Sequence, residues 1–223
     1  QAFYDCTTLS TVLFTGNAPE VGSKAFYAAP ATLYYFPDAN GWGSVVARPT
    51  QPIPLSYTSD GTQVTVTSLD SSYPGHYLPL PAVLGGGYVT AIGNNAFTNC
   101  SSLTSITLPD SVTDIGRGAF YRCTSLAAIN IPGSVTNIGE SAFAYCFSLA
   151  AINIPGNVAN IGNSGFCQCT SLTSVTLLDG VTRIGYLAFW GCTALTALTL
   201  PDSVTDIGSL AFYNCASLAS VVI

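Results

Sequence analysis

The chain has 223 residues, 48% of them hydrophobic, and only 7% are charged, against about 25% in an average soluble domain. Its formal net charge is −6, and its five Lys and Arg residues are too few to bind a nucleic-acid backbone. No apolar run approaches the roughly 18 residues of a membrane span, so composition excludes both nucleic-acid binding and a transmembrane helix.

The first 36 residues are predicted to form a partial array of repeats. Phe3, Cys6 and Leu9 are spaced three residues apart, and Phe26 follows Phe3 after 23 residues. The same order of Phe, Cys and Leu recurs regularly later in the chain. Residues 1–36 are therefore assigned to a first array, which we expect to be interrupted after residue 36.

Residues 37–87 have a different composition. They hold seven of the thirteen Pro residues and the run Gly85, Gly86 and Gly87. Such a stretch is not expected to continue a regular stack of strands. Within it, Asp60 and Gly61 separate two segments with strand propensity, which is the best short-range signal for a hairpin. This segment is predicted to be a linker that contains a β-hairpin.

Residues 88–223 contain six copies of a 23-residue repeat. In each copy a Phe is followed after three residues by a Cys and after three more by a Leu. The phenylalanines are Phe97, Phe120, Phe143, Phe166, Phe189 and Phe212, and the cysteines are Cys100, Cys123, Cys146, Cys169, Cys192 and Cys215. A period of this length indicates that one small unit is stacked on copies of itself.

Each repeat contains two short segments that favour strands. The pattern L-x-x-I-x-L alternates and ends at a proline such as Pro109, and V-T-x-I-G alternates in the same way before a glycine. The pattern A-F-x-x-C-x-x-L between them has the spacing of turns, or of a short 3₁₀ or helical segment. Each unit leaves apolar faces that only another unit can cover. We predict a β-rich solenoid of short parallel strands.

The string L-P-x-S-V-T-x-I-G-x-x-A-F-x-x-C-x-S-L-x-x-I, as in residues 108–129, resembles the BspA-like class of bacterial-type leucine-rich repeats. The resemblance covers residues 88–223 and, more loosely, residues 1–36. It implies a leucine-rich-repeat solenoid in a secreted or cell-surface protein that binds proteins of a host or neighbouring cell. It also implies that the hairpin around Asp60 caps the apolar end of the first repeat.

The repeated cysteines have three interpretations: metal ligands, disulfides or core residues. Metal ligands must converge on one point, whereas the repeat places one thiol in each layer. Parallel side chains in neighbouring layers hold their Cβ atoms farther apart than a disulfide allows. We therefore predict buried free thiols that act as small apolar residues.

No catalytic or cofactor-binding constellation is recognisable. His76 is the only histidine, and no nucleophile motif accompanies it. Asp110 and Asp202 occupy equivalent turns, which leaves calcium binding there as an alternative, but Gly133 and Gly156 fill the same position in other repeats. We expect neither an enzyme activity nor a cofactor or metal ion.

The surface of the solenoid offers one promising set of residues for contact with a protein. Outward-facing strand positions, such as Ser105, Ala128 and Thr107, are small and uncharged and provide no aromatic anchors. Aromatic residues gather instead just after the repeated Phe. The candidate contact residues are Tyr121, Tyr145, Phe147, Trp190 and Tyr213.

A second interpretation stays open, in which the molecule is a subunit of an extracellular filament. Neither end shows a recognisable polar cap, and an open solenoid end presents apolar core and strand edges. End-to-end stacking would use Phe3, Leu9 and Val12 at one end and Leu218, Val221 and Ile223 at the other. The absence of Met indicates a processed protein or an excised piece, and an excised piece would explain the same ends.

Overall fold

A computed structural model describes residues 2–21, 24–42 and 49–223 of the chain. The chain divides into two compact units, Gln1–Leu55 and Ser56–Ile223. Each unit has its own parallel strands and its own buried apolar residues.

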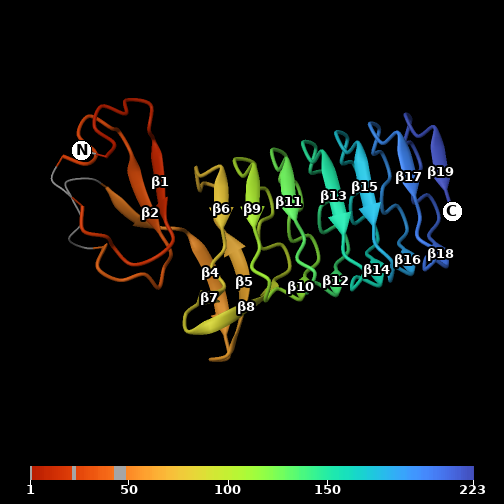
Figure 1. The fold of residues 1–223 in the computed structure, drawn as a ribbon, viewed down its shortest axis with the longest axis horizontal. Coiled ribbons are helices and arrows are strands. Elements are labelled where there is room, and N and C mark those ends of the chain that lie inside the picture. Colours follow the sequence, from red (N-terminus) through yellow and green to blue (C-terminus); the bar gives the residue numbers. More distant parts are fainter. Residues whose placement is uncertain (1, 22–23, 43–48) are drawn as a thin grey trace. The chain divides into compact units, whose positions relative to one another are not determined.

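Among the described residues of the first unit, β1, β2 and β3 form a parallel sheet in the order β1-β2-β3. Figure 1 labels β1 and β2. The strands are β1 (Thr11–Phe14), β2 (Thr32–Tyr35) and β3 (Thr50–Pro52). Leu33 of β2 lies opposite Val12 on one side and Thr50 on the other. Because β3 belongs to the proline-rich segment, this segment contributes a strand to the first array, contrary to our expectation that it would not continue the stack. Pro52 is tolerated because β3 lies at the end of the strand order, where one missing N–H donor breaks no ladder.

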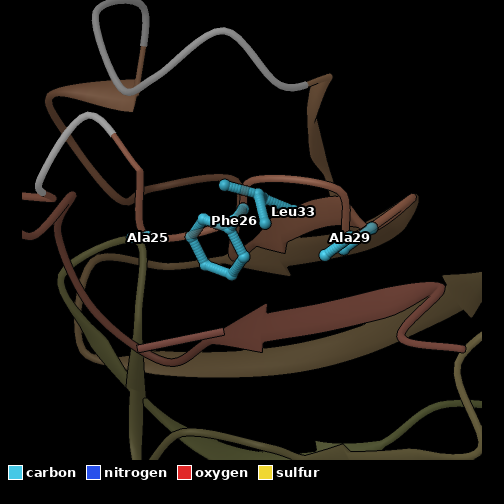
Figure 2. Close-up of a cluster of buried hydrophobic side chains, with 5 residues drawn as sticks. Ala25, Phe26, Ala29 and Leu33 are labelled. Carbon is cyan, nitrogen blue, oxygen red and sulfur yellow. The ribbon is translucent and has the colours of Figure 1, made fainter. Parts of the chain in front are cut away.

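The repeated phenylalanine lies in the core of the first unit. Figure 2 shows Phe26 among Ala25, Ala29 and Leu33, all of which are buried. The ring of Phe3 stacks on that of Phe26 at a centroid distance of 5.0 Å. The equivalent residues of the two repeats therefore lie in successive layers, as their 23-residue spacing predicts.

The second unit is a β-solenoid whose layers follow one another along the chain, with two rows of strands visible in Figure 1. One row comprises β4 (Leu55–Ser59), β5 (Gln63–Leu69), β7 (Val83–Leu84), β8 (Gly87–Ile92), β10 (Asp114–Ile115), β12 (Asn137–Ile138), β14 (Asn160–Ile161), β16 (Arg183–Ile184) and β18 (Asp206–Ile207). The other row comprises β6 (Tyr77–Pro79), β9 (Ser105–Thr107), β11 (Ala128–Asn130), β13 (Ala151–Ile154), β15 (Ser174–Leu177), β17 (Ala197–Thr199) and β19 (Ser220–Val222).

From β8 and β9 onward, neighbouring strands of each sheet pair in parallel, and their paired residues are one repeat apart. Ile115 lies opposite Ile138 in the first row, and Ile106 lies opposite Ile129 in the second row. Burial alternates along strands such as β13, because successive side chains point to opposite faces: Ile152 and Ile154 are buried while Ala151 and Asn153 are exposed. The predicted solenoid of short parallel strands is confirmed. We name each layer by its repeated phenylalanine.

The segment around each phenylalanine consists of turns. No helix occurs within residues 88–223, all of which the structure describes, so the short 3₁₀ or helical segment that we allowed for is absent. Two residues before and two residues after Phe143, the backbone is left-handed, with φ of 56° at Ser141 and 63° at Tyr145. A left-handed residue interrupts a right-handed helix, because its N–H and C=O point away from the helical direction.

These left-handed residues allow the turns to form hydrogen bonds between layers. The N–H groups of Ser141, Phe143 and Tyr145 donate to carbonyl oxygens of the next layer, each at 2.8 Å. The same three bonds recur from the Phe97 layer to the Phe189 layer, and the donors always belong to the earlier layer. The turns therefore join the layers by backbone hydrogen bonds, as the strands do, and in these three bonds the donor is in the earlier layer.

The core of the second unit is a stack of the repeated phenylalanine rings. Neighbouring rings from Phe97 to Phe212 are nearly parallel, with centroids 5.1 to 5.4 Å apart. Cys146 and Leu149 of the Phe143 layer are both fully buried. All six repeated cysteines are buried and free, which confirms the prediction of buried free thiols.

Residues 63–79 form the first layer of this unit although they lack the repeat motif. Strand β5 pairs in parallel with β8, and β6 pairs in parallel with β9. The N–H of Leu69 donates to the carbonyl of Ala96 at 2.7 Å, and the thiol of Cys100 donates to the carbonyl of Leu69 at 3.6 Å. Leu69 thus takes the place that Phe occupies in later layers.

Strands β4 and β5, predicted on either side of Asp60 and Gly61, are neighbours at one end of the sheet. Asp60 Oδ1 accepts the N–H of Thr62 at 2.8 Å and that of Gln63 at 2.7 Å, which fixes the turn between the strands. Leu55 and Val64 of these strands are buried. That the pair acts as a cap, and that the chain divides after residues 36 and 87, stay predictions.

Candidate functional site

Four side chains from two successive layers form a contact cluster on the surface of the second unit. Tyr121 and Arg122 come from the Phe120 layer, and Tyr145 and Phe147 come from the Phe143 layer. The rings of Tyr121 and Tyr145 have centroids 5.4 Å apart and meet edge to face at 75°. Phe147 extends the contact, with its centroid 6.0 Å from that of Tyr145. We call these four residues the aromatic–arginine cluster.

The guanidinium of Arg122 lies against both tyrosine rings. Its Cζ atom is 5.4 Å from the Tyr121 centroid and 5.5 Å from the Tyr145 centroid. A cation within about 6 Å of an aromatic face is attracted by the ring quadrupole. The arginine therefore occupies the corner between the two rings.

The backbone explains why these side chains meet. Arg122 and Tyr145 both lie two residues after the repeated Phe, in left-handed conformation with φ of 58° and 63°. The N–H of Arg122 donates to Ala144 at 2.9 Å, and that of Tyr145 donates to Cys167 at 2.8 Å. Equivalent positions in adjacent layers lie one above the other, so Arg122 and Tyr145 are neighbours although 23 residues separate them.

Arg122 differs in its electrostatic surroundings from the other arginines of the second unit. Arg117 lies 3.5 Å from a Glu140 carboxylate oxygen, and Arg183 lies 3.3 Å from one of Asp206. Within residues 56–223, all of them described, Arg122 has no carboxylate within salt-bridge distance. We had not included Arg122 among the candidate residues. The sequence did contain one indication of its role: Arg122 is one of only five Lys and Arg residues in the chain, and it is next to Tyr121.

The other two candidate aromatics lie away from the cluster. Trp190 is half-buried in the Phe189 layer, and Tyr213 is 59% exposed in the Phe212 layer. The N–H of Gly191 donates to the Tyr213 carbonyl at 2.9 Å, which places these two aromatic positions in adjacent layers. The structure therefore brings together Tyr121, Tyr145 and Phe147 but not the complete predicted set.

The outward positions of the second row of strands, from β9 to β19, form a second surface of small, uncharged side chains. Two shallow hollows of about 540 and 530 Å³ lie on it. The first is lined by residues such as Thr176, Thr199 and Asp179, and the second by residues such as Ala128 and Ala151. From β9 to β19 this face lacks the aromatic side chains that usually anchor a protein partner. Tyr77 of β6, opposite Ser105, is the exception at the first layer and is 50% exposed.

The residues predicted to mediate stacking differ in exposure. Phe3 is 39% exposed, whereas Leu9 and Val12 are partly buried against the core cluster of the first unit. In the Phe212 layer Leu218 is half-buried, while Val221 and Ile223 are 45% and 89% exposed.

No catalytic or metal-binding arrangement is evident among the described residues. The Nδ1 atom of His76 lies 2.9 Å from the Ser102 carbonyl oxygen, a contact that ties the loop before β6 to the next layer. Residues 2–21, 24–42 and 49–223 contain no group of three or more His, Cys, Asp or Glu side chains that could hold a metal ion. In these same ranges no helix is long and apolar enough to cross a membrane.

The fold and the repeat together define the class of the protein, a leucine-rich-repeat solenoid. The BspA type leucine rich repeat region matches residues 1–40 and 90–222 in six copies, and the chain belongs to this family. No curated protein matches the chain.

Solved structures of bacterial leucine-rich repeat proteins are similar to this chain. A Treponema pallidum leucine-rich repeat protein is 34% identical, with 75% of this chain and 68% of that chain covered and a TM-score of 0.56. A leucine-rich cell surface protein of Faecalibacterium prausnitzii is also 34% identical, over 75% of this chain and 52% of its own, with a TM-score of 0.56. A Bacteroides ovatus leucine-rich repeat protein is 29% identical, over 76% and 52%, with a TM-score of 0.57. The chain thus spans about half the length of the latter two.

Proposed function

We propose that this chain is a non-catalytic scaffold that binds a protein partner at the cell surface or outside the cell, through the aromatic–arginine cluster. The observation that carries the proposal is the contact of Tyr121, Arg122, Tyr145 and Phe147 on the surface of the solenoid, where Arg122 and Phe147 are exposed and both tyrosines are half-buried. Tyr and Arg are enriched among the few residues that carry most of the binding energy at protein interfaces, and such residues cluster. The extracellular location is supported by the similarity to a leucine-rich cell surface protein.

The partly exposed rings are also suited to binding because the repeat holds their backbone rigid. Interlayer hydrogen bonds fix the backbones of the cluster, so little order is lost when a partner docks. Phe147 is 40% exposed and has apolar surface that a partner would remove from water.

The proposal is tested by binding of the purified 223-residue chain to a panel of purified extracellular-matrix and cell-surface proteins. Tyr145→Ala and Phe147→Ala should each weaken binding to a panel protein at least about tenfold, as expected for anchor residues. Tyr88→Ala is the matched control, since Tyr88 is 62% exposed in the same unit but lies on β8. Binding that is lost only when Thr176 or Thr199 on the strand face is replaced would contradict the proposal.

A second candidate function, the filament subunit, is favoured by the direction of the turn hydrogen bonds. In the three repeated backbone bonds around each phenylalanine the donor lies in the earlier layer, so the equivalent donors of the Phe212 layer are the N–H groups of Leu210, Phe212 and Asn214. The equivalent acceptors in the Phe3 layer are the carbonyls of Ala2 and Tyr4, since their counterparts Ala25 and Tyr27 accept from that layer. Two copies of the chain would therefore present complementary groups.

Light scattering and electron microscopy of the 223-residue chain test this candidate. Ile207, which is 45% exposed while its equivalents Ile161 and Ile184 are buried, lies on the surface that would be covered. Ile207→Lys should abolish filaments, whereas Thr205→Lys, at an exposed position of the same layer, should not. A monomer at every concentration rejects the candidate.

A further inference from the structure

We propose that Arg122 binds a carboxylate of the partner, so that the aromatic–arginine cluster recognises a protein segment with an acidic residue next to an apolar one. This inference rests on the proposed function and adds the chemistry of the ligand. Its starting point is the isolation of Arg122, the single arginine of residues 56–223 that stands on aromatic rings instead of a carboxylate.

The donors of Arg122 are free for a ligand. Within residues 56–223 its side chain makes neither an ion pair nor a hydrogen bond, although a guanidinium carries five N–H donors in a rigid fork. The nearest arginine along the chain, Arg117, is already paired with Glu140. A carboxylate can accept two parallel hydrogen bonds from the guanidinium, and this paired geometry is stronger and more specific than a single bond.

The two tyrosine rings hold the guanidinium ready for that contact. Arg122 Cζ and the two ring centroids form a triangle with sides of 5.4, 5.5 and 5.4 Å. Contact with the rings restricts the long side chain before binding, so less conformational entropy is lost when the carboxylate arrives. Phe147, beside Tyr145, supplies apolar surface for a neighbouring side chain of the same segment.

The identities of Arg122 and Tyr145 are not explained by local backbone preference. Their position is left-handed in every layer of residues 88–223, and Asn99, Gly191 and Asn214 occupy it elsewhere. Gly and Asn adopt this conformation with least strain, whereas other residues pay an energetic cost of about 1 kcal/mol or more.

A carboxylate on a protein fits the charge distribution better than a polyanion does. A sulfated glycan or nucleic acid needs several cations in a row, whereas residues 56–223 contain three arginines, two of them paired with acids. The net charge of −6 would repel a polyanion further. One unpaired guanidinium among aromatic rings is suited to one carboxylate.

The experiment selects ligands from a random-peptide phage library on the immobilised 223-residue chain and measures selected synthetic peptides by fluorescence anisotropy. We expect an Asp or Glu near an apolar residue in the selected peptides, and replacement by Asn or Gln should weaken binding about 10- to 100-fold. Arg122→Gln should cause the same loss, and combining the two changes should add little. Arg122→Glu should select Lys or Arg instead.

The variants are chosen so that folding does not confound the result. Gln168 occupies the same left-handed position two layers on, with φ of 61°, so the fold accepts Gln in place of Arg122. Arg117→Gln is the matched control, since Arg117 belongs to the same layer but is paired with Glu140; it should leave peptide binding unchanged.

The outcomes separate this inference from the proposed function. Two results would overturn the carboxylate assignment but keep the binding site. In the first, the selected peptides lack Asp and Glu. In the second, they bind Arg122→Gln as tightly as the parent chain but bind Tyr145→Ala more weakly. Selection of no peptide that depends on Tyr145 overturns both. Binding of a heparin oligosaccharide that is lost with Arg122→Gln, in the absence of acidic peptides, also overturns the assignment in favour of a polyanion.

Discussion

The thiol of Cys123 donates a hydrogen bond of 3.0 Å to the carbonyl oxygen of Phe97 in the preceding layer. The same bond joins Cys146 to Phe120 at 3.2 Å and recurs through Cys215. The cysteine of each repeat is therefore a hydrogen-bond donor between layers as well as a small apolar residue. Burial raises the pKa of the Cys146 thiol to about 12 and that of Cys100 to about 11, so both stay neutral at physiological pH.

The buried thiols should make the solenoid sensitive to alkaline pH. A thiol ionises near pH 8.5 in the unfolded chain, while the raised pKa keeps it protonated when folded. Its contribution to stability is therefore complete below about pH 8.5 and is lost as pH rises toward the folded pKa of about 12. Thermal unfolding should shift steeply to lower temperature between about pH 9 and 11. In a Cys146→Ala/Cys169→Ala variant the shift should be smaller; an equal shift would contradict the role of the thiols.

Loss of one stacked ring should weaken the whole second unit. Phe143 is fully buried between Phe120 and Phe166, with both centroid distances 5.1 Å. Phe143→Ala should lower the free energy of unfolding by about 3–5 kcal/mol, because it removes a buried ring and leaves a cavity. Urea unfolding measures this change. Phe147→Ala, at a 40% exposed position of the same layer, should change the value by less than about 1 kcal/mol.

The left-handed positions should reverse the usual effects of Gly and Val. Ser141 has φ of 56°, so Ser141→Gly should raise the free energy of unfolding by about 0.5–1 kcal/mol and Ser141→Val should lower it by about 1–3 kcal/mol. Ser174, an exposed residue of β15, is the matched control. There Gly should destabilise and Val should be neutral or stabilising, because a strand favours branched side chains. If each substitution changed the free energy of unfolding in the same direction at Ser141 and at Ser174, the argument from backbone conformation would be refuted.

The turn between β4 and β5 should depend on the charge of Asp60. Hydrogen bonds from the N–H groups of Gln63 and Thr62 lower the pKa of this carboxyl. Its contribution to stability is present above the unfolded pKa of about 3.9 and is lost as pH falls through the lowered pKa. The melting temperature of Asp60→Ala should therefore lie below that of the parent chain at neutral pH and converge with it near pH 2. A gap that is equally large at both pH values would show that the charge is not involved.

Much of the second unit could be predicted from the spacing of its apolar residues. Each 23-residue copy has one Phe, one Cys and one Leu, and all of these residues can be buried if the copies stack in layers. The rings from Phe97 to Phe212 do form such a stack. Residues 63–79 could not be assigned in this way, because Leu69 stands in the place of Phe and no Cys follows it at the expected distance. Backbone pairing of β5 and β6 with the next layer places them in the solenoid.

The sequence by itself determined the repeat, the inward residues and the family, because these depend on spacing along one chain. It also indicated Tyr121, Tyr145 and Phe147 as surface aromatics. Only the tertiary structure decided that Arg122 lies 5.5 Å from the Tyr145 ring while Trp190 and Tyr213 stay apart from the cluster. The physical reason is that left-handed turns direct these side chains, and that contacts between layers join residues 23 or 24 positions apart, which no local pattern distinguishes from their neighbours.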